Sequence, residues 1–153
     1  MRIVGIDPGK SGGLVLISPD EYLSTKMPAL GSEVDGAALG EWLVLADADL
    51  VVLEDVGARP KQGVVSMFTF GKSQGKVMGV LECLRIPYVL VKPTVWKARV
   101  LRGTARDKDA AIQYVRRRFP QIELIPPGHR VPQDGIADAA CMAVWGLEYR
   151  TLT

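Results

Sequence analysis

Four acidic residues lie at the end of, or within, apolar segments, where a carboxylate loses much of its water. Asp7 follows the apolar run at residues 2–6, and Glu54 ends a second apolar run. Asp134 and Asp138 lie four residues apart in the first turn of a helical pattern, so their side chains face the same way. A partly dehydrated carboxylate is costly, and a divalent cation, or a phosphate held through one, would compensate for that cost.

Three of these acids also have a purely structural interpretation. Asp7 can form a hairpin turn, Glu54 can begin a loop, and Asp134 can cap the last helix. Asp138 differs from them, because it lies within the apolar, alanine-rich run at residues 136–140, where a solvated surface acid is not expected. Both interpretations stay open for the other three positions.

The four acids offer oxygen ligands only. The chain has a single histidine, His129, which lies in a proline-rich loop and is interpreted as incidental, so zinc is disfavoured. Oxygen ligands suit Mg²⁺ or Mn²⁺. Two such ions about 3.5–4 Å apart could hold the attacking water and the leaving 3′ oxygen of a phosphodiester, and we expect two ions per site.

Hydrophobic periodicity predicts elements that would bring these acids together. The first three strands form an antiparallel meander, with a glycine-rich turn at residues 9–13 whose backbone a ligand could approach. The run at 48–55 has an apolar centre without alternation, which is typical of a central strand, parallel to the first. Asp7 and Glu54 would then lie at the same sheet edge, where α/β folds place their sites. The predicted strands are 2–6, 14–17, 22–26, 48–55 and 88–91; the predicted helices are 35–46, 64–84, 107–119 and 134–149, with a short helix opening at 92–97 and a loop at 28–32.

Packing expectations follow from the same patterns. Leu45 belongs to the predicted apolar side of the helix at 35–46, and Cys83 and Cys141 are expected to be buried thiols. Glycines recur every four residues at 71, 75 and 79, which gives a flat stripe that another helix or a nucleic-acid backbone could approach.

Length and composition are typical of one folded domain: 153 residues, 48% hydrophobic and 24% charged. No apolar run reaches the roughly 18 residues of a membrane span, so we expect no membrane association and a cytoplasmic protein. The net charge of +2 is unevenly spread, with −7 over residues 1–57, +4 over 58–91, +7 over 92–118 and −2 over the rest. An acidic part with the candidate site and a basic part that could hold a polyanion suit a metal-dependent enzyme acting on nucleic acid, although solvated helix faces would give the same counts.

Nucleotide-binding glycine motifs are absent. A P-loop ending in Gly9-Lys10-Ser11 would need a glycine where Val4 stands, and one ending in Gly71-Lys72-Ser73 would need a glycine in place of Ser66. We therefore expect no nucleotide cofactor.

Taken in order, these motifs resemble the RuvC family of Holliday-junction resolvases. The resemblance rests on Gly5-Ile6-Asp7-Pro8-Gly9, on Glu54 and on Asp134 with Asp138, and it covers nearly the whole chain. The segment from Gln62 to Gly75, with Gln62-Gly63-Val64, Ser66, Phe68, Phe70-Gly71 and Gly75, resembles the small phage-type members. The resemblance implies an RNase H-like α/β fold, with a five-stranded mixed sheet flanked by helices. It also implies a homodimer that uses Mg²⁺ to make paired nicks in four-way DNA junctions, in a bacterial or phage-infected bacterial cell.

The resemblance also implies roles for single residues. Asp7, Glu54 and Asp138 match the family's metal ligands, with Asp134 as a fourth candidate, and Lys108 would stabilise phosphate charge in the transition state. Two positions depart from the family pattern: the last two acids are four apart rather than three, and Gly57 stands where bacterial members carry an aromatic wedge, for which Phe68 is the nearest substitute. The residues expected to contact DNA are Lys10, Arg59, Lys61, Gln62, Phe68, Lys72, Lys92, Lys97, Arg102, Arg106 and Lys108.

Two other functional classes remain as alternatives. An actin-like ATPase or kinase shares the Asp-x-Gly phosphate hairpin, but it needs two such domains around a nucleotide. A DNA-binding module without catalysis would not need the four acids, so Asp7→Asn would leave its behaviour unchanged.

Overall fold

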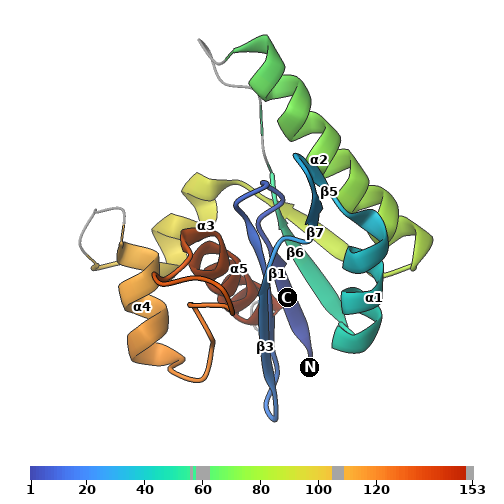
Figure 1. The fold of residues 1–153 in the computed structure, drawn as a ribbon. Helices are drawn as coiled ribbons and strands as arrows, with labels where there is room; N and C mark the ends of the chain where they lie inside the picture. The colour runs from blue at the N-terminus through green and yellow to red at the C-terminus, as the bar shows by residue number, and fades with distance from the viewer. Residues whose placement is uncertain (56, 58–62, 105–108, 151–153) are drawn as a thin grey trace.

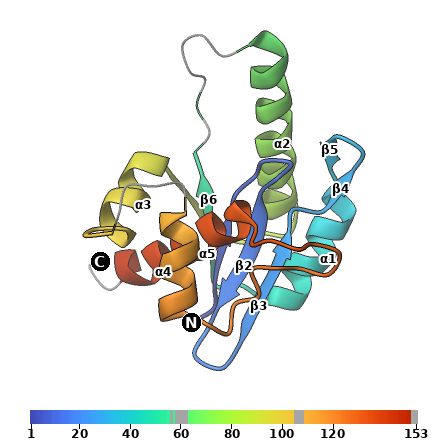
Figure 2. The same cartoon turned by 60° about the vertical axis from the view of Figure 1, so that its left-hand side comes forward.

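A five-stranded mixed sheet lies between two groups of helices in the computed structural model of the chain, which describes residues 1–55, 57, 63–104 and 109–150 (Figures 1 and 2). The strand order is β3-β2-β1-β6-β7. The strands are β1 (Ile3–Ile6), β2 (Gly13–Ile17), β3 (Tyr22–Lys26), β6 (Leu50–Glu54) and β7 (Tyr88–Val91). The helices are α1 (Gly36–Ala46), α2 (Val64–Cys83), α3 (Pro93–Val100), α4 (Ala110–Arg118) and α5 (Asp134–Arg150). This is the predicted five-stranded mixed sheet, with the first three strands antiparallel and β6 parallel to both β1 and β7.

Side chains alternate between the two faces of the central strands, which are almost completely buried. Ile3 and Val52 belong to the core under α3, α4 and α5, whereas Val4 and Leu53 belong to the core under α1 and α2. Figure 2 shows α1 and α2 on one side of the sheet and α3, α4 and α5 on the other. The apolar runs of β1, β2 and β6 are explained by this double coverage.

One expectation about secondary structure and two about burial were wrong. Residues 28–32 are not simply a loop, because β4 (Ala29–Leu30) pairs with β5 (Glu33–Val34) in a small separate ribbon. Leu45 is 76% exposed, since Leu39, Leu43 and Ala46 are the residues that α1 buries. Cys141 is buried as expected, but Cys83 is exposed at the end of α2.

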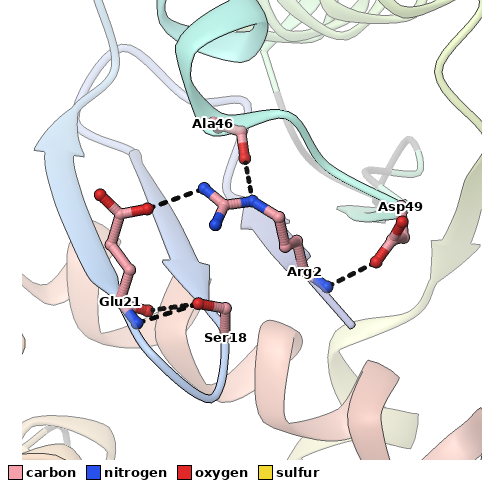
Figure 3. A network of polar contacts seen from close by, with 5 residues as sticks. All are labelled: Arg2, Ser18, Glu21, Ala46 and Asp49. Atoms are coloured by element: carbon pink, nitrogen blue, oxygen red, sulfur yellow. Dashed lines mark hydrogen bonds and ion pairs between the residues drawn. The ribbon is translucent and has the colours of Figure 1, made fainter.

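Arg2 immediately precedes β1, at the other end of the strand from Asp7, and its polar contacts hold this end of β1 in place (Figure 3). Its backbone N–H donates to Asp49 at 2.7 Å, its Nε donates to the Ala46 carbonyl at 2.9 Å, and its Nη2 forms an ion pair with Glu21 at 2.8 Å. Glu21 is itself held in the β2–β3 turn, where its backbone N–H donates to the Ser18 hydroxyl at 3.0 Å. These contacts connect β1 to the turn and to the end of α1.

Among the described residues, no helix is long and apolar enough to span a membrane. Arg59, Lys61, Gln62, Arg106 and Lys108, which the sequence predicts to act on DNA, lie outside the described residues. Their expected roles stay predictions.

Candidate metal centre and nucleic-acid cleft

Asp7 and Glu54 stand at corresponding ends of two neighbouring parallel strands. The register pairs Ile6 of β1 with Leu53 of β6, so each acid lies one residue beyond that pair. The alternation along both strands turns Asp7 and Glu54 towards the face covered by α5. Parallel pairing therefore brings together two carboxylates that are 47 positions apart in the sequence.

The start of α5 lies directly against the β1–β2 hairpin because glycines remove the side chains between them. A Cβ atom on Gly13 would lie 2.8 Å from the Cα atom of Ile136, and one on Gly135 would lie 2.3 Å from the Ser11 carbonyl oxygen. Gly12 and Gly135 also form an isolated parallel bridge. The helix that carries Asp134 and Asp138 approaches the backbone of this turn at Gly12 and Gly13. The turn also lines the cleft from Gly9 to Gly12, so the expectation that a ligand could approach it stays a prediction.

All four predicted acids line one cleft of about 610 Å³. Asp7 comes from the end of β1, Glu54 from β6, and Asp134 and Asp138 from the first turns of α5. The turn after β1, the start of α3 and one aromatic residue of α2 complete the walls. The remaining lining residues are Gly9, Lys10, Ser11, Gly12, Gly57, Phe70, Pro93, Lys97 and Gly135.

Burial and the neighbouring negative charges make Asp7 and Asp138 hard to ionise in the absence of a cation. Burial raises the pKa of Asp7 to about 7, against an ordinary 3.8, and the negative charges of Glu54, Asp138 and Asp134 add to the increase. The Gly9 backbone N–H donates to Asp7 at 3.1 Å and partly opposes this rise in the pKa. Burial likewise raises the pKa of Asp138 to about 6, although Lys97 counteracts it. Shifts of this kind are typical of sites that bind a cation or move a proton.

Two consecutive residues of α3, Trp96 and Lys97, contact Glu54 and Asp138 respectively. The buried indole of Trp96 donates from Nε1 to Glu54 Oε1 at 3.2 Å. The next residue, Lys97, places its ammonium 3.8 Å from Asp138 Oδ2 and 5.0 Å from the centre of the Trp96 ring. The backbone N–H of Gly135 donates to Asp134 at 3.0 Å. Asp134 is the first residue of α5, and the first helical hydrogen bond runs from the Ala137 N–H to the Gln133 carbonyl, so Gln133 and not Asp134 is at the cap position.

The chemistry of the acids fits Mg²⁺ or Mn²⁺, because the candidate ligands are all carboxylate oxygens and their charges repel one another. As they stand, no three acidic, histidine or cysteine side chains of the described residues are gathered closely enough to hold one ion. A divalent cation would attract the same oxygens to itself.

The described residues that were expected to contact DNA fall into three places. Lys10 and Lys97 line the cleft itself, and Lys92 and Arg102 are exposed at the two ends of α3. Phe68 is 68% exposed in the first half of α2, which projects beyond the sheet in Figure 1. Lys72 is different, because both it and Lys76 are paired with Glu33 of the β4–β5 ribbon.

Sequence reasoning missed Trp96, Phe70 and Ser11 as parts of the site. Trp96 lies in a run, Val95-Trp96-Lys97, that reads as an ordinary helix start, and nothing local shows that its N–H reaches a strand 42 positions away. Phe70 was singled out only within the resemblance and as an apolar residue of α2. A signal for Ser11 was its position between glycines, in the turn that follows Asp7.

No family model matches the chain, and no curated protein matches it, but several solved structures do. The structure of Thermus thermophilus RuvC is 20% identical with a TM-score of 0.69, and that of T. thermophilus RuvC in complex with Holliday junction substrate is 18% identical with a TM-score of 0.72. Each match covers 99% of this chain and 96% of the other. Fowlpox virus resolvase in complex with substrate Holliday junction DNA is 13% identical, has a TM-score of 0.56, and is matched over 98% of this chain and 99% of that chain.

The yeast mitochondrial Holliday junction resolvase Ydc2 also matches, with 16% identity and a TM-score of 0.56, over 98% of this chain and 79% of that chain. These identities are low, and the similarity extends over nearly the whole length of the chain. The predicted fold class is confirmed: this chain has the RNase H-like fold of the RuvC-type resolvases.

Proposed function

We propose that this protein is a metal-dependent endodeoxyribonuclease that resolves four-way DNA junctions by phosphodiester hydrolysis. One observation carries the proposal: four carboxylates from β1, β6 and α5 line a single cleft in a fold shared with structures described as Holliday junction resolvases. Two of those structures contain Holliday junction DNA. The cleft supplies acidic chemistry, and the surrounding lysines and arginines supply contacts for a polyanion.

Asp7, Glu54 and Asp138 are proposed as the metal ligands, with Asp134 as a fourth. Two bound Mg²⁺ or Mn²⁺ ions would activate a water molecule and stabilise the leaving oxygen of the phosphodiester. The rigid ends of β1 and β6 fix the backbones of Asp7 and Glu54, and the glycine contacts of α5 fix that of Asp138. Such fixed positions reduce the reorganisation needed when the scissile phosphate enters.

Lys97 is proposed to contact the scissile phosphate. In the structure its ammonium lies beside Asp138, where it reduces the repulsion among the acids. Its side chain is half exposed, so it is free to turn towards an incoming anion. Lys108, which lies outside the described residues, stays the predicted group for stabilising charge in the transition state.

Exposed cations are proposed to hold the arms of the junction. Lys10, Lys92 and Arg102, which are exposed, would contact phosphates. Arg59, Lys61, Gln62 and Arg106 lie outside the described residues and stay predicted DNA contacts. Phe68 is proposed to stack on a base where the duplex opens, because a large aromatic side chain is exposed there on the projecting half of α2. Binding of this kind weakens steeply as the salt concentration rises.

A homodimer is proposed because a four-way junction presents two strands for symmetric nicking. Support comes from an open apolar groove between α1 and α2, lined by Gly40, Val44, Leu45, Val80 and Leu84 among others. The glycines at 71, 75 and 79 of α2 also meet no other atom within 4 Å of an added Cβ, so this stripe is open to a partner helix. Both features would be explained by a second copy of the chain.

The proposal is tested with a labelled synthetic four-way junction, incubated with and without Mg²⁺. The wild-type protein should nick it only with Mg²⁺, and Glu54→Gln should bind it with similar affinity but nick it at least 100-fold more slowly. An exposed acid in the β2–β3 turn, Asp20, gives the matched control Asp20→Asn, which should nick at the wild-type rate. Absence of nicking by the wild type on junctions, forks and flaps would contradict the proposal, and ATP turnover would favour the kinase-like alternative.

A further inference from the structure

The indole of Trp96 contacts both a negative and a positive group of the cleft, the Glu54 carboxylate and the Lys97 ammonium. Its N–H edge donates to Glu54 Oε1 at 3.2 Å, and the ammonium of Lys97 lies 5.0 Å from the ring centre and 3.8 Å from Asp138 Oδ2. An indole has a positive edge and a negative face, so each charge meets the part of the ring that attracts it.

Trp96 is itself held rigidly. Its side chain has no exposed surface and packs in the core formed by α3, α4, α5 and the sheet. Pro93 occupies the first turn of α3, and the Trp96 backbone N–H donates to the Lys92 carbonyl at 3.3 Å. A donor fixed in this way determines where Glu54 Oε1 lies, whereas a glutamate at the end of a strand would otherwise sample several rotamers.

We propose that Trp96 is a positioning residue for the metal site, which fixes one oxygen of Glu54 by its indole N–H and leaves the other oxygen for the ion. Within the described part of the chain, no hydrogen-bond donor to Glu54 Oε2 is present. The inference rests on the proposed function, since it assumes that Glu54 binds a divalent cation. The inference adds Trp96 to the proposed metal site, although Trp96 belongs to none of the acidic or basic motifs of the sequence.

The test measures binding of Mn²⁺ alone, by the loss of the electron paramagnetic resonance signal of the free ion. Trp96→Phe keeps an aromatic ring but removes the N–H, and it should weaken Mn²⁺ binding about tenfold. Trp145→Phe is the matched control, because Trp145 stacks on Tyr149 with ring centres 4.8 Å apart instead of contacting Glu54. This control should bind Mn²⁺ within twofold of the wild type.

A double-mutant cycle separates positioning from a general loss of packing. If Trp96 acts through Glu54, replacing Trp96 by Phe in a Glu54→Gln protein should change Mn²⁺ affinity less than twofold. An equal loss in both backgrounds, or Mn²⁺ binding by Trp96→Phe as tight as the wild type, would overturn the inference while leaving the proposed nuclease intact. Failure of the wild type to bind Mn²⁺ would instead contradict the proposed function.

A spectroscopic measurement avoids any folding defect of Trp96→Phe. The chain has three tryptophans, so Trp42→Phe with Trp145→Phe leaves Trp96 as the only indole. Mg²⁺ should shift the fluorescence of this protein at the concentrations that support nicking, and Glu54→Gln should abolish the shift. Emission that stays constant through saturation of the site would show that Trp96 does not contact the ion-binding glutamate.

Discussion

The carbonyl oxygen of Ala139 lies 1.8 Å from the point where a Cβ atom on Gly5 would be placed. The Ala143 backbone nitrogen lies 2.7 Å from the same point. Strand β1 and helix α5 therefore pack backbone against backbone, with no side chain between them. This contact sets the distance between Asp7, which follows β1, and Asp138, which precedes Ala139.

Replacing Gly5 by alanine should destabilise the protein by about 3 kcal/mol or more, because a backbone carbonyl cannot move aside as a flexible side chain can. The same change should lower nicking, since α5 must shift and carry Asp138 with it. Urea unfolding measures the first effect. The matched control is Gly63→Ala, just before α2, where an added Cβ would meet no atom within 4 Å and φ is −61°, so the change should alter stability by less than about 1 kcal/mol. Equal stability of Gly5→Ala and the wild type would show that β1 and α5 are not in such close contact.

Metal-free protein should lose stability as the pH rises from about 4 to 7. Burial raises the pKa of Asp7 to about 7 in the folded state, so the folded protein retains a proton that the unfolded chain, at an ordinary pKa of 3.8, has already released. Ionisation of Asp7 therefore lowers the free energy of unfolding most strongly above pH 7 and has no effect on it below about pH 4. Asp138, with its pKa raised to about 6, acts in the same direction.

Asp7→Asn should remove most of the loss of stability that the ionisation of Asp7 causes at high pH. In EDTA it should be more stable than the wild type at pH 8, by up to about 4 kcal/mol, and the difference should disappear near pH 4. Thermal unfolding followed by circular dichroism across this pH range gives the comparison. Adding Mg²⁺ at pH 8 should raise the melting temperature of the wild type but not of Asp7→Asn. Parallel stability profiles for the two proteins would contradict the environment described for Asp7.

Glu33 should restrain the binding of DNA by neutralising two lysines of α2. Hydrogen bonds from Lys72 and Lys76 hold the pKa of the Glu33 carboxyl at about 2, so it stays charged at any physiological pH. Glu33→Gln should bind a four-way junction several-fold more tightly at low salt, and the dependence of affinity on salt should become steeper by roughly one counterion per released lysine. Asp20→Asn, which changes an exposed acid in the β2–β3 turn, should show no such gain. If the affinity of Glu33→Gln depended on salt just as that of the wild type does, neither Lys72 nor Lys76 would contact DNA.

Leu45→Asp should convert the proposed dimer into a monomer without unfolding the chain. Leu45 lines the open groove between α1 and α2 and is 76% exposed, so a charge there costs the isolated fold little. Leu30→Asp provides the control, because Leu30 is 71% exposed on β4 but does not line the groove. Light scattering during gel filtration measures both masses. A dimeric Leu45→Asp protein would exclude this groove as the interface.

Strands and helices close to one another in sequence could be predicted well because their signals are local. Of the two residues that could cap the first helix, Ser32 and Asp35, the structure uses Asp35, whose carboxylate accepts from the backbone N–H groups of Ala37 and Ala38. The parallel pairing of β1 with β6 was predicted from the apolar centre of residues 48–55, which has no alternation and is typical of a strand covered on both faces. Asp138 stood out because its neighbours are all apolar, and in the structure those neighbours are core residues.

Other features depend on contacts that leave no local trace. The β4–β5 ribbon has strands of two residues, which are too short for an alternating pattern. Leu45 and Cys83 belong to apolar patterns, and such a pattern looks the same whether the chain's own core or another surface covers it. The hydrogen bond from Trp96 to Glu54 joins α3 to β6, and only the three-dimensional packing shows it.

Helix α5 supplies much of the apolar core on its side of the sheet and also carries Asp134 and Asp138. Each residue of an α-helix turns the chain by about 100°. An insertion or deletion of one residue between Asp138 and Ala143 would therefore rotate either the acid out of the cleft or Ala143 away from Gly5. The number of codons in this stretch of the gene is therefore fixed.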